Sequence, residues 1–168
     1  MTDNHKNISD LSWMKIAANY IGLHEGTSLK ANPKVVKFFA ESQHPDIKND
    51  HTTPWCAAFV GAVLFEAGLP NTGSLLALSY AKYGQKLDKP VVGAIATKKR
   101  KGGGHVFFVV SFDDKYVYGL GGNQNDQVSI ARFDRKIINS YTWPIGVKIP
   151  DKQQNIVIAN TATNVKET

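Results

Sequence analysis

The sequence predicts an α+β fold in which N-terminal helices pack on a C-terminal antiparallel β-sheet. Apolar residues recur at helical spacing through the first half of the chain, whereas the second half holds short runs of β-branched and aromatic residues separated by turn signals. A chain of 168 residues with 42% hydrophobic and 20% charged residues has the size and composition of one globular domain. We expect this domain to span residues 13–150, between polar segments at 1–12 and 151–168.

Four helices are expected, at residues 13–21, 33–39, 56–67 and 74–83. The second helix has the clearest start signal, because Asn32 is a good N-cap and Pro33 suits the first helical position. The third follows Thr53-Pro54 and ends at Gly68. Its spacing of apolar residues predicts an amphipathic helix with Cys56 in its first turn.

Five strands are expected in the second half, at residues 91–97, 105–112, 116–120, 128–133 and 145–149. Residues 98–104 form a basic, glycine-rich stretch that we interpret as a loop leading into His105. If 113–115 is a three-residue hairpin loop, Phe112 pairs with Tyr116 and His105 lies opposite Asn123. A two-residue loop would place Gly122 there instead. Glycines 119 and 121 would let the Cys56 helix approach the sheet closely.

Cys56 is the single cysteine of the chain, which excludes an intramolecular disulfide and a zinc site built on several thiolates. The N-terminal end of a helix favours negative charge and therefore a thiolate. A thiolate beside a base can act as a nucleophile. The alternative is a structural role, since free cysteine is often buried as a small hydrophobic residue.

His105 is the histidine most suited to be that base, because it opens a strong strand directly after a flexible glycine run. An asparagine beside the imidazole could fix its tautomer and orientation, which makes Asn123 the candidate third residue. We expect no metal or cofactor, since no histidine has a partner at metal-binding spacing.

These residues resemble the NlpC-type and CHAP superfamily of papain-like cysteine amidases and peptidases. The resemblance covers roughly residues 13–150. It is carried by Ile21-Gly22 with Glu25, Asn32-Pro33, Trp55-Cys56-Ala57-Ala58-Phe59-Val60, Gly104-His105-Val106 and Gly121-Gly122-Asn123-Gln124. Two features depart from the family pattern: Trp55 stands where many NlpC-type enzymes have aspartate, and the identity of the third catalytic residue varies within the superfamily.

The resemblance implies a peptidoglycan hydrolase that cleaves an amide bond in wall peptides through a thioester. Cys56 would be the nucleophile, held by His105 as a thiolate–imidazolium ion pair, and Asn123 the orienting residue. Trp55, His51, Gly104 and Gln124 would contribute to the substrate groove, although Trp55 could equally anchor the core. A catalytically inactive module of the same fold that binds the wall or a partner is the alternative, and a nucleic-acid-binding protein is a less favoured third class. Within the enzyme class, a papain-like transferase or deamidase also stays open.

The net charge of +6 suggests an anionic partner, and a wall polymer, a membrane surface and a nucleic acid all fit that charge. We expect no membrane insertion and no nucleic-acid partner, because a four-residue basic run without paired stacking aromatics is typical of a solvated loop. The N-terminus shows no signal peptide. We therefore expect a monomer that is synthesised in the cytoplasm and acts on the cell wall. It would reach the wall either by injection, as a type VI secretion effector with a cognate immunity protein, or by release, as a phage lysin.

Overall fold

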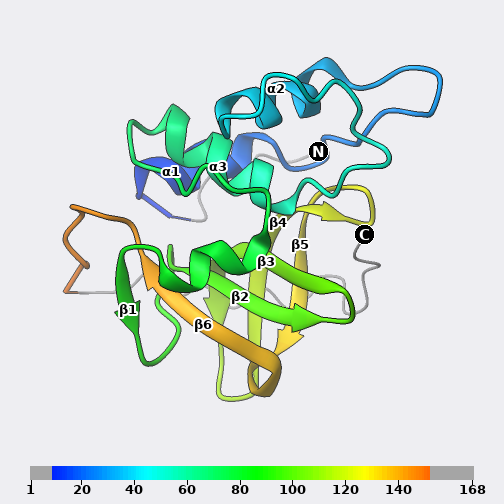
Figure 1. The fold of residues 1–168 in the computed structure, drawn as a ribbon. Helices are drawn as coiled ribbons and strands as arrows, with labels where there is room; N and C mark the ends of the chain where they lie inside the picture. The colour runs from blue at the N-terminus through cyan, green and yellow to red at the C-terminus, as the bar shows by residue number, and fades with distance from the viewer. Residues whose placement is uncertain (1–8, 152–168) are drawn as a thin grey trace.

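The computed structural model describes residues 9–151, which form one layer of helices over one antiparallel sheet (Figure 1). The α+β class predicted from the sequence is confirmed. The elements, in chain order, are α1 (Ser12–Asn19), α2 (Pro33–Glu41), α3 (Cys56–Glu66), the 3-10 helix η2 (Ala77–Lys82), β1 (Gln85–Leu87), β2 (Ile95–Arg100), β3 (Gly103–Phe112), β4 (Tyr116–Gln124), β5 (Gln127–Asp134), the 3-10 turn η3 (Arg135–Ile137) and β6 (Ile138–Trp143).

The six strands are arranged in the order β1-β6-β2-β3-β4-β5, and every pair is antiparallel. Strands β2 to β5 form consecutive hairpins, while β6 returns to pair between β1 and β2. Helix α3 packs against β3 and β4 and is flanked by α1 and α2, so it is the central helix of the layer (Figure 1).

The helix predictions hold for α1, α2 and α3. Asn32 caps α2 by accepting a hydrogen bond from the Lys34 amide at 3.0 Å, and Pro33 is its first residue. Helix α3 begins at Cys56 as expected, but it is not amphipathic, because every residue from Cys56 to Leu64 is buried. Helices on two sides and the sheet on a third leave it no solvent face. The predicted helix over 74–83 is shorter, a 3-10 helix.

Two predictions for the second half of the chain are wrong, one of a strand and one of a loop. Residues 145–149 are not a strand; the sixth strand is β6, whose alternating polar residues concealed it. Residues 98–104 are mostly strand, because β2 continues to Arg100 and β3 starts at Gly103, which leaves only a two-residue turn.

Within the described residues no helix is long and apolar enough to cross a membrane. The predicted end segments lie mainly outside the described residues.

The β3–β4 hairpin also differs from its predicted register. Phe112 lies opposite Val117 rather than Tyr116, because Asp113 accepts the Lys115 and Tyr116 amides at 2.8 and 2.7 Å and widens the turn. These two hydrogen bonds hold the pKa of Asp113 below its usual range. A bulge between Val109 and Ser111 then restores the expected pairing of Val109 with Gly119.

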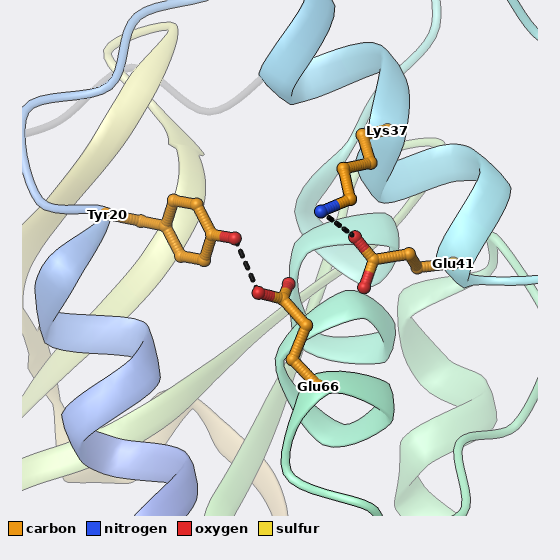
Figure 2. A network of polar contacts seen from close by, with 4 residues as sticks. All are labelled: Tyr20, Lys37, Glu41 and Glu66. Carbon is orange, nitrogen blue, oxygen red and sulfur yellow. Dashed lines mark hydrogen bonds and ion pairs between the residues drawn. The ribbon is translucent and has the colours of Figure 1, made fainter.

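A cluster of two carboxyl groups joins the three helices on the side away from the sheet (Figure 2). Glu66 of α3 accepts a hydrogen bond from the Tyr20 hydroxyl at 2.6 Å, and Lys37 lies 3.5 Å from Glu41 of α2. Burial, followed by the neighbouring Glu66 charge, raises the pKa of Glu41. Burial and the hydrogen bond to Glu66 also raise the pKa of Tyr20. The folded state therefore favours protonated Glu41.

The direction of this shift predicts how stability depends on pH. A raised pKa in the folded state gives stability that is complete below the ordinary glutamate range and is lost as pH rises through the folded pKa. Glu41→Gln should therefore flatten the fall of the unfolding free energy between pH 4 and 8, by about 1 kcal/mol. Urea unfolding at several pH values measures this, with the exposed Asp88→Asn as control. An unchanged pH profile in Glu41→Gln would contradict the assignment.

Candidate active site

The N-terminus of α3 is seated where strands β3 and β4 separate. The β3–β4 register pairs run from Phe112 and Val117 to Phe108 and Leu120, and so end before the first residues of β3. The backbone amide of Val106, two residues further out, hydrogen-bonds the sulfur of Cys56 instead. Val106 follows His105 directly, so this contact places the sulfur beside the strand that carries the predicted base. The His105 ring itself packs against Phe107 and Phe133, with a centroid distance of 5.8 Å to each.

Gly122 of β4 makes this close approach possible. A Cβ atom at position 122 would lie 2.6 Å from Cβ of Phe59 and 2.9 Å from ring atoms of Trp55, both at the start of α3. The sequence assigned this role to Gly119 and Gly121, which is wrong, because they face the other side of the strand and are covered by Phe107. Phe107 crosses them to stack on Phe133 at a centroid distance of 4.5 Å.

His105 is held by Gln124, the last residue of β4. The ring Nε2 lies 2.9 Å from Oε1 of Gln124. The orientation of the amide is fixed, because its Nε2 donates to the carbonyl oxygens of Ser129 and Gly119 at 2.8 and 3.3 Å. Its Oε1 can only accept, so Nε2 of His105 must carry the proton. In the neutral ring the lone pair is then on Nδ1, which is the nitrogen able to act as a base.

Asn123 lies in a bulge of β4, beyond the last β3–β4 register pair at Phe108 and Leu120. Pairing between β4 and β5 shifts between Gly121 and Gln124, and Asn123 has a left-handed φ of 60°. This extra residue turns the Gln124 side chain toward His105. Asn123 is buried, with 1% of its surface exposed. Its role as the orienting residue stays a prediction, whereas the contact with Nε2 of His105 belongs to Gln124.

The remaining sequence candidates lie in different environments. Trp55 is fully buried and donates from its Nε1 to Oε1 of Glu25 at 3.0 Å, so in this form it anchors the core, and its role in a substrate groove stays a prediction. Burial is also the main cause that raises the pKa of Glu25. Gly104 is buried, and a Cβ there would lie 2.7 Å from Leu78 of η2. His51 is exposed in the loop before α3.

The site is closed to solvent in this conformation. Cys56 is 3% exposed and His105 1% exposed. Burial raises the pKa of the Cys56 thiol, although the amides of Val106, Ala57 and Cys56 and the charge of Arg100 act in the opposite direction. The helix terminus thus favours the thiolate as expected, but desolvation is larger. Burial thus favours the thiol over the thiolate at Cys56, and the ion pair with His105 that the family resemblance implies stays a prediction.

Sequence reasoning missed two participants that the structure adds. Arg100 was interpreted as part of a solvated loop, and Ser129 was not considered. Among the described residues, no group of three or more His, Cys, Asp or Glu side chains is arranged to hold a metal ion. Comparison with known proteins adds no assignment: no family model, no curated protein and no solved structure matches the chain.

The contact between α3 and Gly122 can be tested by a pair of glycine substitutions. Gly122→Ala should lower the unfolding free energy by about 1–3 kcal/mol, because the added methyl group overpacks a rigid junction of helix and strand. Gly103→Ala is the control, since a Cβ at position 103 meets nothing within 4 Å. Urea unfolding compares the two variants, and equal effects would show that α3 does not depend on Gly122.

Proposed function

We propose that the protein is a cysteine hydrolase with a papain-like fold that cleaves an amide bond in cell-wall peptides. The observation that carries this proposal is the Gln124 amide, whose fixed orientation leaves Nδ1 of His105 as a base one residue from the amide that binds Cys56. The wall as substrate rests on the family resemblance and on the net charge of +6.

The residues suggest a mechanism with balanced proton transfers. His105 takes the proton of the Cys56 thiol, and the sulfur attacks the carbonyl carbon of the substrate to give a tetrahedral oxyanion. The amides at the start of α3 lie near the sulfur and can donate to that oxyanion. The C–N bond breaks as His105 protonates the leaving amine, which leaves a thioester. His105 then activates a water molecule, whose attack releases the acid and the thiol.

In this mechanism Gln124 is a positioning residue. It accepts from Nε2–H and stabilises the imidazolium that forms in both steps, without touching the reacting atoms. Ser129 and Gly119 in turn hold its amide. Because Cys56 is buried, substrate binding has to expose its sulfur before the attack.

The direct test is mass analysis of purified wall fragments after incubation with the protein. Cleavage at one amide bond is expected, and Cys56→Ala and His105→Ala should each abolish it while keeping the fold. Their double variant should be little worse than either single variant, because residues that act as a unit are strongly non-additive. Cleavage by purified Cys56→Ala would contradict the cysteine mechanism.

The same assay separates the two candidates for the orienting residue. Gln124→Ala should reduce kcat by roughly 10- to 1000-fold with little change in KM, since it removes only the positioning of His105. Asn123→Ala, one residue away, should reduce kcat less. A larger loss in Asn123→Ala would return the orienting role to Asn123.

The burial of Cys56 and His105 favours a second candidate, a catalytically inactive wall-binding module of the same fold. Wild type and Cys56→Ala would then bind wall fragments equally and release no product. Fusion to an export signal distinguishes the candidates in cells, because only an active hydrolase should lyse the host, and Cys56→Ala should remove the lysis. Lysis by an injected effector would also require an immunity protein in its producer.

A further inference from the structure

Arg100 is the last residue of β2, and its side chain lies over the residue that precedes the proposed base. It pairs with Gly103 across the β2–β3 turn. Its Nε donates to the carbonyl oxygen of Gly104 at 3.1 Å. From Gly104 the chain continues to His105 and to Val106, whose amide binds the sulfur of Cys56. The guanidinium is thereby held beside the residue that precedes His105.

The guanidinium of Arg100 is also available to a ligand. The side chain is partly exposed, whereas Cys56 and His105 are closed to solvent. Within the described residues, Nε is the atom of Arg100 that has a hydrogen-bond partner, which leaves both Nη groups as donors. Two Nη groups in one plane match the two oxygens of a carboxylate. The charge of Arg100 also acts on Cys56 and lowers the pKa of its thiol, against the larger effect of burial.

The neighbouring basic residues do not share this arrangement. Lys99 points to the opposite face, because successive residues of a strand alternate, and it is exposed. Lys98 is buried, with its ammonium 5.6 Å from the Phe133 ring. Arg100 therefore combines, within this basic run, a fixed side chain, partial exposure and proximity to His105.

We propose that Arg100 binds a free carboxylate on the substrate residue that leaves as the amine. This inference rests on the proposed hydrolase function, and it assigns that site a substrate class: amide bonds whose leaving amino acid carries a carboxylate next to the new amine. The carboxylate lies on the side of His105 because Arg100 is tied to Gly104, and His105 protonates the leaving group. Binding a carboxylate at Arg100 would also remove a positive charge that favours the Cys56 thiolate.

Two synthetic wall-type peptides that differ only in a terminal carboxylate or carboxamide on the leaving residue test the specificity. Wild type should cleave the carboxylate form roughly 10- to 100-fold faster in kcat/KM. Arg100→Gln should lose most of that preference, Arg100→Lys should keep part of it, and Lys99→Gln should behave as wild type. A preference that survives unchanged in Arg100→Gln would overturn the proposal.

A second measurement does not depend on hydrolysis. The titration of Cys56, followed by NMR of its carbon-13-labelled Cβ, should shift to higher pH in Arg100→Gln but not in Lys99→Gln. Added acetate should shift wild type in the same direction, and acetamide should not. If the peptides are not cleaved but acetate acts through Arg100, the hydrolase function fails and the carboxylate site stands. If acetate and acetamide act alike on wild type, the carboxylate site is refuted, whatever the outcome with the peptides.

Discussion

Helix α3 can reach the point where β3 and β4 separate because position 122 has no side chain. The helix brings Trp55 and Phe59 against Gly122 and places the Cys56 sulfur on the amide of Val106. This packing fixes the cysteine relative to the strand that carries His105. The same packing buries the sulfur, so one constraint both assembles the site and raises the pKa of its thiol.

The polar part of the site depends on a second, smaller network. Gln124 contacts the histidine, and the backbone carbonyls of Gly119 and Ser129 decide which way its amide faces. An amide held in this way determines a tautomer, and the tautomer determines which nitrogen can take a proton. Arg100 adds the one partly exposed charge that acts on Cys56.

Much of this arrangement could be predicted from the sequence. Asn32-Pro33 marks the start of α2, and Thr53-Pro54 precedes α3. The position of Cys56 in a first helical turn and of His105 near the start of a strand followed from local signals.

The strand register near the site could not be predicted from local signals, because two bulges in β3 and β4 depend on tertiary packing. Asn123 and Gln124 are neighbours, and only the left-handed backbone at Asn123 decides which one meets His105. Strand β6 was missed because its polar Ser140 and Thr142 find hydrogen-bond partners in the interior.

The central claim is that Gln124 fixes His105 with its proton on Nε2, and nitrogen-15 NMR of the imidazole measures this directly. At a pH where the ring is neutral, we expect Nε2 to give the signal of a protonated nitrogen and Nδ1 that of an unprotonated one. In Gln124→Ala the two signals should move toward each other as the tautomers mix. A wild-type ring protonated on Nδ1 would contradict the account, because the nitrogen assigned as the base would then hold no lone pair.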